Sequence, residues 1–195
     1  MESFLQLSES EGNSLYINHS WAMGKFVIKG DDGNDVPLDF EHLLIHPDFR
    51  TGYGKFDDGH YKYVWDQQVG VRPDNYKELV AQEYKRAFSA RVYIKDKGVY
   101  LWQRHSFFEG QAFDEAVSAC WKDKVEGKVP CFKYVGSERV SLKRGASGFK
   151  AKLEYVKWVD KPADFDEPSD MGSSEVRTVT LGEGGSGELD EELPF

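Results

Sequence analysis

The fold of this chain is decided by residues 88–104, which read FSARVYIKDKGVYLWQR. Apolar and polar side chains alternate on both sides of a central turn, and a period of two is typical of β-strands rather than helices. A two-residue loop at Lys97-Gly98, with the glycine at positive φ, would close the two strands into a hairpin. The stretch therefore predicts a β-hairpin whose register depends on the length of that loop.

The two-residue loop would also sort the side chains onto two faces, because directly opposed residues share a face of the sheet. One face would be apolar core: Phe88, Ala90, Val92, Ile94, Val99 and Leu101. The other would be an exposed patch of cations and rings: Arg91, Tyr93, Lys95, Tyr100, Trp102 and Arg104. Rings stack on bases with roughly 1–3 kcal/mol per base, and cations neutralise phosphates. The patch predicts a surface for single-stranded nucleic acid; the alternative is that the rings pack beneath a loop.

Patterns on both sides of the hairpin predict further strands and two helices. Strands are expected at residues 15–20, 26–28, 36–46, 61–65, 129–135 and 149–159. A short helix is expected after Pro73-Asp74-Asn75, and a longer one over residues 111–125, where apolar side chains recur at helical spacing. Residues 50–60 contain three glycines and are expected to form a surface loop.

The order of these elements, apart from the N-terminal strands, is strand, two-stranded hairpin, helix, then two strands. That is the order of an OB-fold, a five-stranded Greek-key barrel whose second and third strands and adjoining loops bind oligonucleotides. We therefore predict a mostly-β OB-fold with extra N-terminal strands and one or two helices. The basic, glycine-rich loop 143–148 would join strands four and five. Further candidate DNA contacts are Lys143, Arg144, Lys150 and Lys152 near this loop, and Tyr63 and Trp65 on an earlier strand.

Charge divides the chain into a body and a tail. The chain carries 34 acidic and 25 basic residues, a net charge of −9. Residues 160–195 hold 11 acidic and two basic residues, which is also −9, so residues 1–159 balance to zero. Within that body, residues 84–105 (+5) and 121–158 (+6) are basic. The pattern predicts one domain over residues 1–159 and a flexible acidic tail over residues 160–195, for which a merely solubilising role is the alternative.

The end of the tail is acidic and closes on an aromatic residue. Its last six residues are Asp190, Glu191, Glu192, Leu193, Pro194 and Phe195. This tip resembles the C-terminus of bacterial single-stranded DNA-binding proteins, although leucine stands where isoleucine is usual before Pro-Phe. An acidic, Phe-ended tail on an OB body also resembles phage-encoded replication and recombination proteins of that function. The resemblance implies sequence-independent single-stranded DNA binding in replication, recombination and repair, with these six residues docking partner proteins.

The remaining sequence signals concern disulfides, membrane spans, metal sites and catalytic motifs. They are weak, and most of them argue against these features. Cys120 and Cys131 form no disulfide framework or zinc ribbon, so we expect a reducing cytoplasm, that of a bacterial host if the protein is phage-encoded. No segment suits a membrane span or a secretory signal. His42 and His46 are poorly placed for a metal, and no catalytic motif is present, so no cofactor, metal or enzymatic activity is expected. Two alternatives remain open, a protein-binding adaptor and an OB-containing nuclease, as does the choice between monomer and dimer.

Overall fold

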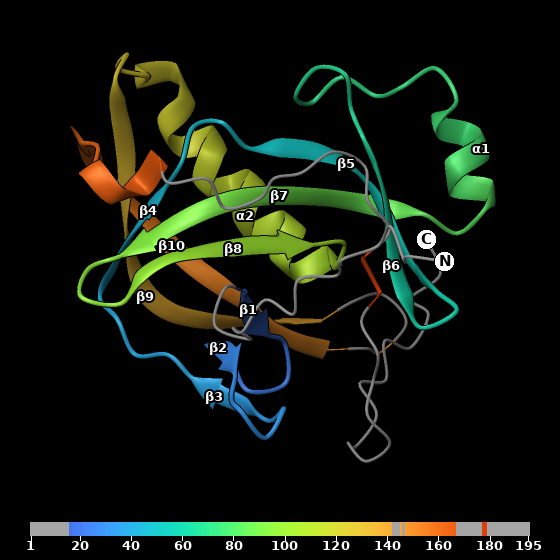
Figure 1. The fold of residues 1–195 in the computed structure, drawn as a ribbon, viewed down its shortest axis with the longest axis horizontal. Coiled ribbons are helices and arrows are strands. Elements are labelled where there is room, and N and C mark those ends of the chain that lie inside the picture. The colour runs from blue at the N-terminus through green and yellow to red at the C-terminus, as the bar shows by residue number, and fades with distance from the viewer. Residues whose placement is uncertain (1–15, 142–144, 146, 167–176, 179–195) are drawn as a thin grey trace, which may run out of the picture.

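The computed structural model describes residues 16–141, 145, 147–166 and 177–178. Over these residues the predicted mostly-β fold is confirmed, with antiparallel sheets and two α-helices (Figure 1). The small sheet contains β1 (Ile17–Ser20), β2 (Lys25–Lys29) and β3 (Asp35–Pro37). The large sheet contains β4 (His42–Ile45), β5 (Arg50–Asp57), β6 (His60–Trp65), β7 (Lys85–Ile94), β8 (Gly98–Arg104), β9 (Lys128–Ser141), β10 (Ser147–Asp160) and β11 (Arg177–Thr178). The helices are α1 (Tyr76–Ala81) and α2 (Phe107–Cys120), and short 3-10 helices lie at Trp121–Asp123 and Ala163–Asp166.

Strand β7 is the centre of the large sheet. Along one edge its first half pairs with β5 and its second half with β4, while β8 pairs along the other edge. β4 also pairs with β9, and β9 with β10, so the sheet runs β10-β9-β4-β7. Helix α2 packs against β10 and β7 (Figure 1). The inner side chains of these strands and of α2 form one hydrophobic core.

Strand β1 lies between β8 and β10, the end strands of the order β8-β7-β4-β9-β10. Tyr16 forms a parallel bridge with Leu101 of β8. On the other side, the Phe149 N–H of β10 donates to the Trp21 carbonyl oxygen at 2.7 Å. The N-terminal strand therefore contacts both β8 and β10, which are not paired with each other among the described residues.

The turn of the central hairpin differs from the two-residue loop expected at Lys97-Gly98. Ile94 pairs with Gly98, so the loop is the three residues 95–97, and Asp96 adopts φ 64° while Lys97 N–H donates to the Ile94 carbonyl oxygen. An odd number of loop residues inverts which side chains of β8 share a face with those of β7. The predicted separation into an apolar and a basic-aromatic face is therefore wrong.

Trp102 and Tyr100 belong to the core as a result. Trp102 pairs with Ala90 and is 0 % exposed, with its ring centroid 5.3 Å from Phe26 and 5.1 Å from Phe88. Tyr100 is also buried. Rings in these positions cannot stack on a base without unfolding the domain, so both are withdrawn as nucleic-acid contacts.

Residues 50–60, expected to be a surface loop, instead form β5 and its turn into β6. Asp57 pairs with His60, which leaves Asp58-Gly59 as a two-residue turn with φ values of 52° and 78°. Both values suit a type I′ turn, for which Asp-Gly is a strong sequence signal. The glycines at 52 and 54 suggested a loop, but Asp58-Gly59 was the better guide to this segment.

The folded body extends past the expected boundary at residue 159. Phe165 is 0 % exposed, its ring lies 5.1 Å from His46 and 5.8 Å from Tyr93, and its carbonyl oxygen accepts from Arg91 Nη1 at 3.2 Å. The Phe165 side chain covers the outer face of the β4–β7 pair. The boundary at 159 is therefore too early.

A buried carboxylate joins α2 to the hairpin and to β1. Glu109 is buried, and its Oε2 accepts from the indole Nε1 of Trp102 at 2.6 Å and from the backbone N–H of His19 at 2.9 Å. Its Oε1 accepts from Arg104 Nε at 2.8 Å. Ser106 caps the helix by accepting from the Glu109 N–H. The Glu109 side chain therefore joins α2, the β7–β8 hairpin and β1 through hydrogen bonds.

His19 is expected to make stability depend on pH. Burial lowers the pKa of His19 from 6.5 to about 4, although a hydrogen bond with the Gly24 backbone opposes this. The unfolded chain binds a proton below pH 6.5 and the folded chain does not until about pH 4, so stability falls as pH drops through this window, by about 3 kcal/mol in total. Urea unfolding between pH 7 and 4 should show a flatter profile for His19→Gln than for wild type. The exposed His42→Gln control should keep the wild-type slope, and a His19→Gln slope equal to wild type contradicts the assignment.

Candidate functional site

The predicted basic-aromatic patch on the hairpin is not assembled. Arg91 is buried, and its Nη2 lies 3.4 Å from His46 Nε2 while its Nη1 bonds the Phe165 carbonyl oxygen. Arg104 is bonded to Glu109. Tyr93 is partly buried beside Phe165. Lys95 is exposed in the turn, so it is the single member of the patch left fully accessible to a ligand.

The basic residues predicted to contact DNA near the β9–β10 turn differ in their surroundings. Lys150 is buried, with its Nζ 2.8 Å from Glu115 Oε1 and 2.8 Å from Glu138 Oε1. Burial opposes a charge there, but hydrogen bonds with the two carboxylates raise the pKa of Lys150, so it holds α2 to the sheet and is withdrawn as a DNA contact. Lys152 is exposed on β10. Lys143, Arg144 and the tip residues Asp190, Glu191, Glu192, Leu193, Pro194 and Phe195 lie outside the described residues.

The remaining candidates, Tyr63 and Trp65, belong to a row of rings on β6 that we call the aromatic ladder: Tyr61, Tyr63 and Trp65. Alternation along the strand places all three on one face. The rings of Tyr63 and Trp65 are stacked, 5.0 Å between centroids and 4° between planes, and Tyr61 and Tyr63 follow at 6.4 Å and 21°. All three side chains are partly buried, so each keeps some surface open to a ligand.

Two glycines on β5 make room for the ladder. Gly52 pairs with Trp65 and Gly54 with Tyr63. A Cβ at position 52 would lie 2.8 Å from Trp65 Cα, and one at position 54 would lie 2.7 Å from the Tyr63 ring. The Tyr63 ring therefore lies directly against Gly54, and a side chain at 52 or 54 would collide with the Trp65 backbone or the Tyr63 ring.

Polar groups border the ladder on the β8 side. His105 lies 5.5 Å from the Tyr61 ring and 6.3 Å from the Tyr63 ring. Burial raises the pKa of the Tyr63 hydroxyl to about 12, while a hydrogen bond with Gln103 and the charge of Arg104 act in the opposite direction. The Tyr63 hydroxyl is therefore neutral at physiological pH and anchors the middle ring to β8.

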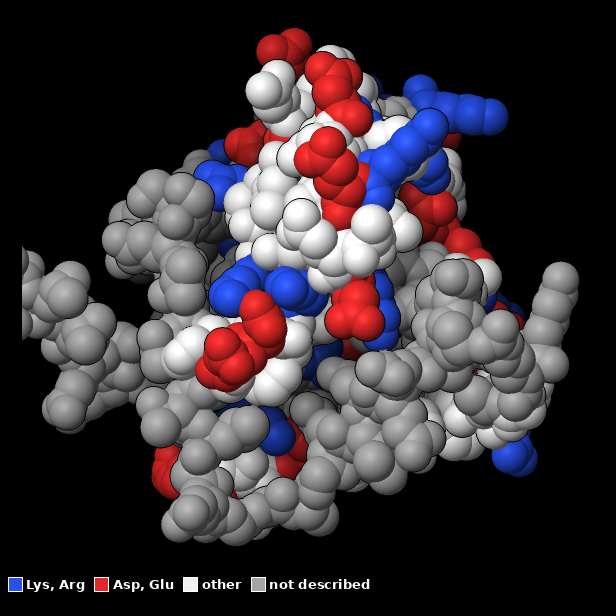
Figure 2. All heavy atoms as spheres, turned by 90° about the vertical axis from the view of Figure 1, so that its right-hand side faces the viewer, with Lys and Arg blue, Asp and Glu red and all other residues white. Residues whose placement is uncertain are grey.

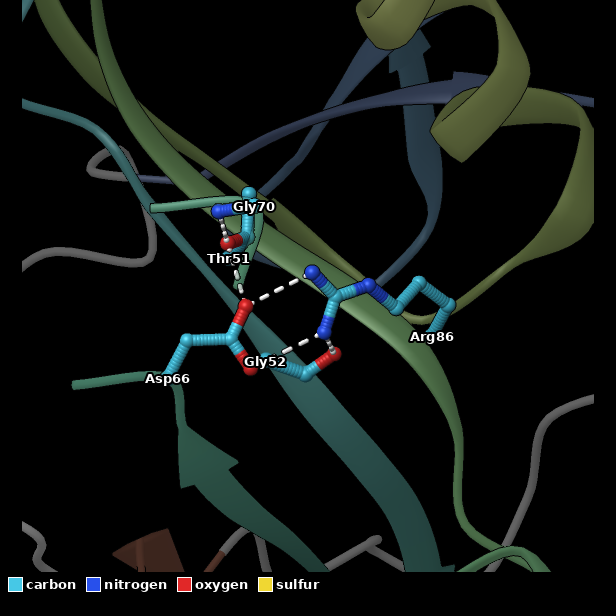
Figure 3. Close-up of polar contacts among 5 residues, drawn as sticks. All are labelled: Thr51, Gly52, Asp66, Gly70 and Arg86. Carbon is cyan, nitrogen blue, oxygen red and sulfur yellow. Dashed lines mark hydrogen bonds and ion pairs between the residues drawn. The ribbon is translucent and has the colours of Figure 1, made fainter. Parts of the chain in front are cut away.

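The end of the ladder is held by the contacts drawn in Figure 3. Asp66 follows Trp65, and its side chain is 0 % exposed. It accepts from Arg86 through both carboxylate oxygens, at 2.9 and 2.6 Å, and from Thr51 Oγ1 at 2.5 Å. Thr51 Oγ1 in turn accepts from the Gly70 N–H at 2.7 Å, and Arg86 Nη1 donates to the Gly52 carbonyl oxygen at 3.1 Å. This network fixes the chain that follows Trp65 to β5 and β7, on the sheet face opposite to the ladder rings.

Charges near the ladder are mixed rather than uniformly basic. Figure 2 shows lysine and arginine interspersed with aspartate and glutamate on the side of the molecule where β6 and α1 lie. Lys55 and Lys62 both pair with Asp57. Lys85 lies in register with Gly54 and hence on the ladder face, and it makes no ion pair within the described part of the chain. The site can therefore stack planar groups, with few cations available for a polyanion.

Comparison with family models, with curated proteins and with solved structures finds no match for this chain. Among the described residues, no group of three or more His, Cys, Asp or Glu side chains could hold a metal ion. In the same residues, no helix is long and apolar enough to cross a membrane. The assignment of function therefore depends on the geometry of the ladder.

Sequence reasoning placed Tyr63 and Trp65 on a strand but missed their surroundings. The two turn residues Asp58-Gly59 were the available signal for the β5–β6 hairpin. The pairing of Arg86 with Asp66, 20 residues apart, had no local signal. Neither had the role of Glu109, which precedes the helix predicted over residues 111–125, whereas α2 begins at Phe107.

Proposed function

We propose that the chain binds single-stranded nucleic acid, with bases stacked on the aromatic ladder of β6. The observation that carries this proposal is a row of three partly exposed, nearly parallel rings on one sheet face. An inserted base needs about 7 Å between rings, so the 5.0 Å gap between Tyr63 and Trp65 excludes insertion there. Bases would instead lie against the open surfaces of the row, an arrangement that tolerates any sequence because every base has a π-face.

The OB-fold is the finer fold assignment that we attach to this proposal. The pairing β8-β7-β4-β9-β10, with α2 between β8 and β9 in the chain, supports it. In this assignment β4 and β5 together are the first strand, and β1 lies where the barrel would close. The ladder then extends the first strand through the β5–β6 hairpin. We propose further that the acidic tip recruits replication or recombination proteins, as the resemblance of the tip implies.

Trp65→Ala should weaken binding of an oligo-dT strand by tenfold or more, since stacking contributes roughly 1–3 kcal/mol per base. Fluorescence anisotropy of a labelled strand at fixed ionic strength measures the effect. Trp121→Ala is the matched control, because Trp121 is 39 % exposed and lies beyond α2, against Phe49. Urea unfolding checks that both variants remain folded. A folded Trp65→Ala variant with wild-type affinity contradicts the ladder as the binding site.

A gel shift with oligo-dT and divalent metal present separates the proposal from the two alternative functions. Retarded, intact DNA supports a binding protein. Degraded DNA identifies a nuclease, and an unshifted strand leaves the adaptor function, with the tip as the binding element.

A further inference from the structure

We propose that a second contact site for single-stranded nucleic acid lies at the corner of the molecule where β1 and β8 end. The site consists of two exposed rings and two cations, and we call it the corner patch: Trp21, Phe107, Lys25 and Arg139. This inference rests on the proposed function, because the strand that stacks on the aromatic ladder would continue onto the patch. The patch would hold further bases and their phosphates.

The ends of β1 and β8 bring the two rings of the patch to one corner. The bridge between Tyr16 and Leu101 is parallel, so the two neighbouring strands run in the same direction (Figure 1). Glu109 binds a donor near the end of each strand, which keeps these ends together. Trp21 directly follows β1, and Phe107 begins α2 just after β8. The two rings therefore reach the same corner from separate parts of the chain.

Both rings are exposed, and both are held from one side. Trp21 is 43 % exposed and Phe107 is 40 % exposed. A Cβ at Gly148 of β10 would lie 3.1 Å from the Trp21 ring and 3.0 Å from the Phe108 ring, so these rings rest against the backbone of β10. The Phe107 ring contacts Phe108 edge-on, 5.7 Å between centroids. The rings are thus positioned in the free protein, which lowers the entropic cost of binding a base.

A short connection joins the corner patch to the aromatic ladder. The ring of His105 lies 5.5 Å from that of Tyr61, at one end of the ladder. Phe107 follows His105 by two residues, so their α-carbons lie no more than about 7 Å apart. Sites of this kind cover roughly 4–16 nucleotides of a single strand. One strand can therefore contact the ladder and the patch together.

The corner patch also offers the cations that the ladder lacks. Lys25 opens β2 beside the turn that carries Trp21. Arg139 lies in register with Phe149, whose ring would touch a Cβ at Gly24 of the same turn. Both cations are exposed, and within the part of the chain that the structure describes neither makes an ion pair. Rings beside available cations suit a strand that carries a phosphate at every nucleotide.

The first test is the affinity for an oligo-dT strand of about 16 nucleotides, long enough to reach both sites. Trp21→Ala should weaken binding by about tenfold, through the loss of one stacked base. Trp21→Phe keeps a ring and should restore most of the affinity. Trp121→Ala is the matched control, since Trp121 is also exposed but lies at the other end of α2, about 20 Å away. Urea unfolding checks that each variant is folded.

The second test is the salt dependence of the same binding. Each phosphate neutralised contributes about −0.7 to the slope of log affinity on log salt for single strands. Lys25→Met should therefore reduce the magnitude of the slope by about 0.7. Lys122→Met is the matched control, because Lys122 is an exposed cation beside Trp121 and makes no ion pair among the described residues. Its removal should leave the slope unchanged.

The outcomes separate this inference from the proposed function. If wild type binds no oligonucleotide, both fail. If Trp65→Ala weakens binding while folded Trp21→Ala and Lys25→Met keep wild-type affinity and slope, the corner patch alone is refuted and is left to a protein partner. Weaker binding in Trp21→Ala that Trp21→Phe does not restore, with an unchanged slope in Lys25→Met, also overturns the inference and leaves Trp21 with a structural role.

Discussion

Trp102→Ala is expected to destabilise the domain by about 3–5 kcal/mol, the range for removing a fully buried large aromatic side chain. Trp102 is 0 % exposed and lies edge-on to Phe26, Phe88 and Phe113, so its removal leaves a cavity lined by three rings. The same change also removes the indole donor to Glu109. Urea unfolding followed by far-UV circular dichroism measures the loss.

Trp121→Ala is the control, and we expect it to cost less than about 1 kcal/mol, as for an exposed site. This experiment also decides between the two registers of the hairpin. With the two-residue loop, Trp102 would face a ligand, and its replacement would weaken oligonucleotide binding in a stable protein. A Trp102→Ala variant with near wild-type stability would contradict the three-residue loop and the buried position of the ring.

Glu109→Ala is expected to cost about 3–5 kcal/mol, the range for breaking a buried ion pair by removing one partner. Three donors lose their acceptor: the His19 N–H, the Trp102 indole and Arg104 Nε. The helix, the hairpin and β1 all lose the side chain that joins them. Urea unfolding at neutral pH measures the effect.

Two further variants make this result specific. Glu109→Gln keeps one carbonyl acceptor and removes the charge, so it should lie between wild type and alanine, at about 1–3 kcal/mol. Asp114→Ala, at an exposed position of the same helix, should change stability by less than about 0.5 kcal/mol. A Glu109→Ala variant within 1 kcal/mol of wild type would show that water replaces the carboxylate and that the junction is not held by it.

The aromatic residues and the lysines predicted for the site differ in how well local sequence could place them. Alternation along β6 was enough to place Tyr63 and Trp65 on one face, because side-chain direction in a strand depends only on neighbours in the chain. Lys150 alternates equally well, yet it lies buried between Glu115 of α2 and Glu138 of β9. Charge and spacing cannot separate a phosphate-binding lysine from one that joins a helix to a sheet, because the difference lies in the partner, which is distant in the chain.

Local sequence determined that this protein is mostly β, where most of its strands and its long helix lie, and which residues of each strand share a face. Those properties follow from side-chain period and turn chemistry within a few residues. Only the tertiary structure decided the register of β8 against β7, the burial of Trp102, the packing of the ladder over Gly52 and Gly54, and the pairing of Arg86 with Asp66. The physical reason is that one added loop residue exchanges the two faces of a strand at little local cost. The choice between registers is then made by the burial energy of the whole core.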